Sequence, residues 1–191
     1  MSDEAAMGGE RVGIFGGSFN PPHVGHVLAA AYALLVCPID RILIVPVYQH
    51  PFAKALTPFE HRLAMCERAF ADLPRASVSV VERELGGESL TLRTLERLAS
   101  DHPSWRMRLL VGSDVVGEVH KWHRFDRISE IAPPFIIARR GTTGGDRSIL
   151  PEVSSTEVRA LLAANDQAAL EQLVPSSVIA YAREHRLFGL P

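Results

Sequence analysis

Short apolar segments alternate along the chain with longer segments in which apolar residues recur every three or four positions. The apolar runs predict strands at 11–16, 41–47, 76–82, 106–112 and 135–139. The longer segments predict helices at 24–36, from Pro58 to about 72, and at 89–100. From Ser154 to about Arg186 the pattern is again helical, with a break at Pro175. The chain is therefore expected to alternate between the two kinds of element.

This alternation predicts an α/β fold of the Rossmann-like, doubly wound type. We expect a mainly parallel sheet of five to six strands, with helices on both faces and a helical C-terminal tail. Ligands of such sheets bind beyond the carboxyl ends of the strands, near the switch in strand order. Functional residues should therefore follow strands directly.

Composition narrows the class of protein further. The chain has 191 residues, 47% of them hydrophobic, and 20 basic against 22 acidic side chains give a net charge of −2. This length suits one domain, which we expect at 11–191 after a disordered tail at 1–10. The balanced charge provides no general attraction to nucleic acid or to a membrane surface.

The sequence also predicts the location of the protein and the state of its two cysteines. The N-terminal segment lacks the basic-then-apolar order of a signal peptide, and no apolar run is long enough to span a membrane. We therefore expect a cytoplasmic protein. Cys37 and Cys66 lie among helix-like apolar residues and are expected to be reduced core thiols.

The segment GIFGGSFNPPHVGH, residues 13–26, joins the first strand to the first helix. Its glycines allow close approach of the backbone to a ligand, and the helix that follows points free N–H groups at the loop. His23 and His26 share a face of the first helical turn, where they can donate hydrogen bonds to phosphate oxygens. The alternatives are a glycine turn with two capping histidines, or a zinc pair for which the sequence places no third ligand.

The segment VSSTEVR, residues 153–159, contains a second set of phosphate-binding groups. Ser154 and Glu157 have the spacing of a capping box, so an ordinary well-capped helix would explain them. Ser155 adds a hydroxyl at the helix N-terminus, and Arg159 lies one turn further along the same face. From these residues the ordinary cap and the phosphate site are equally well supported.

Together the two segments resemble the paired motifs of the nucleotidyltransferase superfamily, H-x-G-H and [IV]-S-S-T-x-[IVL]-R. Further segments resemble bacterial nicotinate-nucleotide adenylyltransferases in the same order: SLTLRTLERL at 89–98, VGSDVVGEVHKW at 111–122, ARRG at 138–141 and LVPSSVIAYAREHRLF at 173–188. The resemblance implies transfer of AMP from ATP to nicotinate mononucleotide, with release of pyrophosphate. It implies Mg²⁺ bound through the ATP phosphates, with no protein metal ligand.

The resemblance also assigns roles to individual residues. Those implied for catalysis are His23, His26 and Arg159. Those implied for ATP binding are Gly16, Gly17, Ser18, Lys54, Gly112, Asp114, Ser155 and Thr156. Those implied for the mononucleotide are Thr91, Trp122, whose ring would stack on the pyridine, and His123. The partners are then these two nucleotides, with no nucleic acid and no membrane, and a homo-oligomer stays open.

The chain departs from the family pattern where the pyridine is recognised. Leu90 and Arg93 replace a common Tyr and Asp, and His123 replaces a common Tyr. The sequence therefore leaves nicotinamide mononucleotide or phosphopantetheine as alternative substrates, and a non-catalytic nucleotide sensor as an alternative function. It also leaves open whether Lys54 is the phosphate-facing lysine, and whether Arg62, Arg139 and Arg140 contact substrate.

Overall fold

The computed structural model describes residues 8–50, 55–113, 122, 124–138 and 150–190. Within these residues, five parallel strands form one sheet in the order β3-β2-β1-β4-β5. The strands are β1 (Arg11–Gly17), β2 (Arg41–Pro46), β3 (Ala76–Val78), β4 (Arg106–Gly112) and β5 (Pro134–Ile137). The predicted parallel α/β fold is confirmed.

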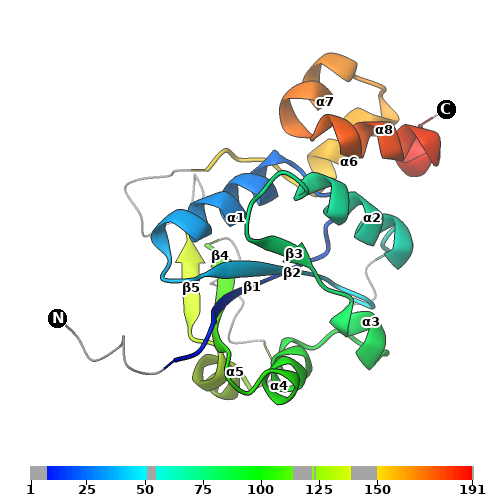
Figure 1. Ribbon diagram of the computed structural model, residues 1–191. Helices are drawn as coiled ribbons and strands as arrows, with labels where there is room; N and C mark the ends of the chain where they lie inside the picture. Colours follow the sequence, from blue (N-terminus) through cyan, green and yellow to red (C-terminus); the bar gives the residue numbers. More distant parts are fainter. Residues whose placement is uncertain (1–7, 51–54, 114–121, 123, 139–149, 191) are drawn as a thin grey trace.

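Helices cover both faces of this sheet (Figure 1). On one face lie α1 (Val24–Val36), α2 (Phe59–Ala69), α6 (Ser155–Ala163), α7 (Gln167–Leu173) and α8 (Ser176–Glu184), followed by a short 3₁₀ turn at Leu187–Gly189. On the other face lie α3 (Val81–Leu85), α4 (Thr91–Asp101) and α5 (Phe125–Ile131).

The alternation of side chains along β2 explains why both faces are covered. Ile42 and Ile44 are fully buried in the cluster beneath α1 and α2. Leu43 and Val45 point the other way, into the cluster formed with α4 and α5. A strand that is apolar at every position must be covered on both sides to remove its surface from water.

Two of the predicted segments contain a change of structure that the sequence pattern did not predict. The strand predicted at 76–82 stops at Val78, and Val81 already begins α3. The change from strand to helix occurs at Ser79. Its N–H donates to Ile44 O of β2, and its hydroxyl accepts from Val81 N. The predicted helical tail has a second break besides Pro175, at Asn165, whose φ of 51° ends α6.

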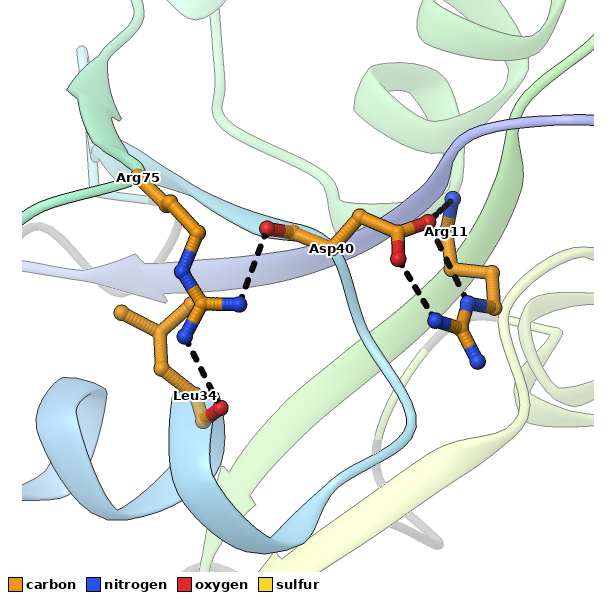
Figure 2. Close-up of polar contacts among 4 residues, drawn as sticks. All are labelled: Arg11, Leu34, Asp40 and Arg75. Atoms are coloured by element: carbon orange, nitrogen blue, oxygen red, sulfur yellow. Dashed lines mark hydrogen bonds and ion pairs between the residues drawn. The ribbon is translucent and has the colours of Figure 1, made fainter.

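Arginine side chains fasten the turn between α1 and β2, at the amino end of the strands (Figure 2). Arg75 donates to Leu34 O at the end of α1 and to Asp40 O. Arg11 hydrogen-bonds the Asp40 carboxylate through its side chain and its backbone N–H, which lowers the pKa of Asp40 to about 2. A hollow of about 260 Å³ lies at this same end, where Arg106, Met107 and Arg108 of β4 line it.

The switch in strand order falls between β1 and β4, because the chain runs outward from β1 through β2 to β3 and then returns to β4. The carboxyl ends of β1 and β4 are Gly17 and Gly112. The site is therefore expected beyond these two glycines, at the opposite end from the hollow. Among the residues described, no helix is both long and apolar enough to cross a membrane.

Candidate active site

The segment Ser18–His23, here called the β1–α1 loop, crosses the carboxyl end of β1. Phe19 anchors it, with a side chain only 1% exposed and a backbone φ of 44°. Its ring makes edge-on contacts with Phe15 and Phe70, with centroids 5.7 and 6.0 Å apart. The ring also lies edge-on to His26 at 4.9 Å. An apolar anchor thus fixes the loop and supports the second histidine.

The two histidines lie in contact at the start of α1. His23 is the N-cap and is 2% exposed, and its ring centroid is 3.8 Å from that of the half-buried His26. The backbone N–H of His23 donates to Nδ1 of His26 at 3.2 Å. Because Nδ1 is the acceptor, the neutral ring of His26 carries its proton on Nε2. His26 is therefore set as a hydrogen-bond donor through Nε2.

The N-terminus of α6 docks directly onto the β1–α1 loop. Ser155 Oγ donates to Pro21 O at 3.0 Å, although the two residues are 134 positions apart. Arg159 donates from Nη1 to Asn20 O at 2.8 Å and from Nη2 to Thr156 Oγ1 at 3.0 Å. The two sequence segments that were predicted to act together are thus in contact.

The predicted cap of α6 is also present, because Ser154 Oγ accepts from Glu157 N at 3.1 Å. The cap and the docked face use different residues. Ser154 caps the N-terminus of the helix, while Ser155 and Arg159 contact the loop. The ordinary helix cap and the special contact surface therefore coexist in one segment.

The packing around position 25 explains why a glycine lies between the two histidines. A Cβ built at this buried position would lie 3.1 Å from Cε1 and Nδ1 of the His23 ring and 3.7 Å from Cβ of Val153. The first turn of α1 therefore packs against His23 and against the residue that precedes α6. A larger side chain would compress this contact.

Arg62 is neither a phosphate-facing side chain nor an ordinary exposed arginine of α2. It is 1% exposed and donates to three backbone carbonyls, those of Thr57, Ser18 and Tyr48, at 2.8, 3.1 and 3.3 Å. Burial lowers the pKa of its guanidinium. Arg62 occupies the buried stripe of α2 beside Phe59, Met65 and Cys66.

Three buried polar residues near the site were not predicted. Asn20 is 4% exposed and accepts from Thr57 N at 3.3 Å, while its carbonyl accepts from Arg159. Glu82 and Thr94 are 8% and 4% exposed and hydrogen-bond each other at 3.0 Å. The sequence does contain a signal for Glu82, because this charged residue directly follows the two valines at the start of α3.

The remaining predicted site residues are more widely distributed. Gly16 and Gly17 end β1, and Gly112 ends β4. Thr91 is the half-buried first residue of α4, on the face of the sheet opposite α1. Trp122 packs edge-on against Phe125 with centroids 6.2 Å apart, on the same face as α4. The predicted residues Lys54, Asp114 and His123, and also Arg139 and Arg140, lie outside the described residues.

Arg93, which departs from the family pattern, stabilises a turn. Its guanidinium donates to the carbonyls of Leu85, Gly86 and Glu88, which form the turn between α3 and α4. Cys37 and Cys66 are both buried, as predicted for core residues, and burial raises the pKa of the Cys66 thiol. Within the described ranges, no group of three or more His, Cys, Asp or Glu residues is placed to hold a metal ion.

Comparisons with known proteins identify the family of the chain. Residues 14–161 match the cytidylyltransferase-like family model. A probable nicotinate-nucleotide adenylyltransferase of Anaeromyxobacter dehalogenans (strain 2CP-C) is 42% identical over 187 residues, covering 95% of this chain and 98% of the relative. A protein of the same name from Myxococcus xanthus is 42% identical over 183 residues, covering 94% and 95%.

Among solved structures, the nicotinic acid mononucleotide adenylyltransferase of Plasmodium falciparum complexed with NaAD superposes with a TM-score of 0.83. It is 19% identical and covers 95% of this chain and 98% of its own, so this likeness concerns the fold. The relatives of higher identity match almost end to end and carry one name. The chain therefore belongs to the cytidylyltransferase-like family and, within it, to the nicotinate-nucleotide adenylyltransferases.

Proposed function

We propose that this protein transfers the adenylyl group of ATP to nicotinate mononucleotide, forming nicotinate adenine dinucleotide and pyrophosphate in NAD synthesis. The observation that carries the proposal is the docking of α6 onto the β1–α1 loop. It places the histidine pair and the hydroxyl and guanidinium groups of α6 around one loop at the switch point of the sheet. The names of the relatives support the choice of substrates.

In the proposed reaction, a phosphate oxygen of the mononucleotide attacks the α-phosphorus of ATP. A bond forms between that oxygen and the phosphorus, and the bond from the α-phosphorus to the bridging oxygen breaks as pyrophosphate leaves. Negative charge grows on the bridging oxygen, where Nε2–H of His26 would donate a hydrogen bond. No protein group needs to become covalently attached, because positioning and charge stabilisation suffice.

The triphosphate would lie between the two helix N-termini. Gly16, Gly17 and Ser18 offer backbone and hydroxyl groups from the β1 side, with His23 beside them. Ser155, Thr156 and Arg159 would hold the β- and γ-phosphates from α6, whose N-terminus favours negative charge. Arg159 contacts the β1–α1 loop through Nη1, and this hydrogen bond to Asn20 O holds the guanidinium beside the loop.

The residues described suit a Mg²⁺ ion held by the nucleotide rather than by the protein. Mg²⁺ prefers phosphate oxygens and water, and the described residues gather no carboxylate cluster to compete with them. When bound, the ion would neutralise charge on the departing pyrophosphate.

The remaining assignments stay part of the proposal. Gly112 and Asp114 would contact the adenosine, and Lys54 the phosphates. Thr91, Trp122 and His123 would bind the nicotinate end. We propose a cytoplasmic location for the enzyme, with these nucleotides as its partners.

Release of pyrophosphate tests the proposal directly. The purified protein is incubated with ATP, Mg²⁺ and, in separate reactions, nicotinate mononucleotide, nicotinamide mononucleotide or phosphopantetheine. We expect turnover with nicotinate mononucleotide and at least tenfold lower kcat/KM with the amide. Equal use of the amide would contradict the proposed substrate preference. ATP binding without pyrophosphate release from any acceptor would indicate a nucleotide sensor instead.

A further inference from the structure

A buried network of charged and hydroxyl side chains surrounds the segment Val47–His50, here called the β2 loop. This segment leaves the carboxyl end of β2, beside the β1–α1 loop. One backbone hydrogen bond, from Val47 N to Gly17 O at 2.9 Å, joins the β2 loop to the last residue of β1. The side chains of the network come from α2, α3, α4 and the turn that precedes α4, and none of them has a role in the reaction proposed above.

The peptide groups of Tyr48 are held from both sides by opposite charges. The Tyr48 N–H donates to Glu82 Oε2 at 3.0 Å, and the Tyr48 carbonyl accepts from Arg62 Nη2 at 3.3 Å. Both charged side chains are almost completely buried. Charged hydrogen bonds in a site that excludes water are stronger than neutral ones, so Tyr48 has little freedom to move.

Each charged residue also contacts a segment of the site. Arg62 contacts the β1–α1 loop of the proposed ATP subsite, and Glu82 contacts residues on either side of Thr91 in the proposed mononucleotide subsite. On one side, Arg62 Nη1 donates to Ser18 O of the β1–α1 loop at 3.1 Å. On the other, Glu82 accepts from the hydroxyl of Thr94 in α4 at 3.0 Å, and from the hydroxyl of Ser89. Ser89 lies two residues before Thr91 and ties itself to Gln49 of the β2 loop through both backbone and side chain.

The network therefore forms a continuous chain of contacts from Ser18 to the start of α4. Burial raises the pKa of Glu82, while the hydrogen bonds from Ser89, Tyr48 and Thr94 act against that rise. The positive charge of Arg62 also favours the carboxylate form. Each charge thus has hydrogen-bond partners and an opposite charge nearby, which burial of both requires.

We propose that Arg62 and Glu82 are positioning residues that hold the β1–α1 loop and the start of α4 at the separation that aligns the two substrates. This inference rests on the proposed function, because it assigns ATP to one end of the network and the mononucleotide to the other. Neither residue touches substrate. They act through the backbone of Tyr48, and alignment of attacking and accepting groups is a large part of the rate in this class of reaction.

Glu82→Gln is the central test, because it keeps the shape of the side chain but removes the charge. We expect kcat to fall at least tenfold and KM for nicotinate mononucleotide to rise severalfold. KM for ATP should stay within about twofold, since Ser18 keeps its contact with Arg62. Calorimetric titration of ATP counts the folded sites, so kcat is expressed per binding site and partial unfolding cannot imitate the result.

Ser89→Ala provides a milder variant, in case Glu82→Gln fails to fold, and Ser79→Ala is its matched control. Ser79 also accepts a backbone hydrogen bond, from Val81 N, but takes no part in the network. We expect Ser89→Ala to lower kcat per site severalfold and Ser79→Ala to leave it unchanged. Equal kcat for both variants, or a parallel rise of both KM values in Glu82→Gln, would overturn the proposal.

A double-mutant cycle with Arg62→Lys tests whether the two residues act as one unit. Because both hold the same residue, Tyr48, the combined loss in kcat should be smaller than the product of the separate losses. Strictly multiplicative losses would refute the shared action. Failure of the wild-type protein to release pyrophosphate with any acceptor would instead refute the proposed function, so the two failures are distinguishable.

Discussion

Replacing Gly25 with alanine sets two effects against each other: the helix propensity of residue 25 and the packing of the histidine pair. Gly25 lies in the first turn of α1 with no left-handed φ, so alanine can adopt the same backbone. Alanine favours a helix over glycine by at most about 1 kcal/mol, and less near a helix end. On propensity, the variant should be slightly more stable than the wild type.

The packing around Gly25 opposes this gain. The new methyl carbon would lie 3.1 Å from two atoms of the His23 ring, which must move by a few tenths of an ångström. His23 is 2% exposed, and its ring lies against His26 at 3.8 Å, so the displacement passes to His26. Strain of this kind costs about 1–3 kcal/mol and should outweigh the gain in propensity.

We therefore expect Gly25→Ala to lose about 1 kcal/mol of unfolding free energy, and kcat to fall about tenfold, because displacements well under 1 Å already impair alignment. Urea unfolding gives the first quantity and pyrophosphate release the second. Ala31→Gly, on the same helix, is the control. It should lose about 1 kcal/mol through propensity and keep its kcat. A more stable Gly25→Ala protein with full kcat would show that the position of His23 does not matter.

Three further substitutions test other parts of the site and the fold. His26→Ala removes the Nε2 donor and should lower kcat by about 10²–10³-fold in single-turnover measurements, and a loss below threefold would remove His26 from the mechanism. Arg159→Lys keeps the charge but not the planar fork that reaches Asn20 O, so kcat/KM for ATP should fall about tenfold. Asp40→Asn should cost about 0.5 kcal/mol at pH 7, the size of an exposed ion pair. Because the hydrogen bond from Arg11 holds the pKa of Asp40 at about 2, below its ordinary 3.8, this stabilisation is present above pH 4 and is lost between about pH 4 and pH 2. Urea midpoints of the two proteins should converge there, and a constant difference down to pH 2 would contradict the assignment.

The elements with the longest apolar runs were predicted well from sequence. The helix at 24–36 has the bounds that its run of apolar residues and Pro38 indicate, and β4 begins and ends as predicted. The family resemblance implied that the histidine segment and the start of α6 act together on one triphosphate, and the structure brings the two segments into contact.

Residues whose role depends on distant backbone atoms were not predictable. Arg62 occupies the apolar stripe of α2, which could have indicated burial, but its acceptors are carbonyls of three separate segments. Glu82 was assigned to a strand, because nothing local shows that β3 ends at Val78. Such contacts depend on how loops are brought together, which periodicity does not record.

The docking of α6 also has a consequence for synthesis of the protein. Ser155 and Arg159 bind carbonyl oxygens of Pro21 and Asn20, so residues near the end of the chain complete a loop near its beginning. All five strands that the structure describes precede α6 in the sequence. On the ribosome, a nascent chain can therefore form the sheet before α6, which completes the proposed nucleotide site, is available to dock. Catalytic competence should therefore arise only after α6 has emerged from the exit tunnel and docked, later than closure of the sheet.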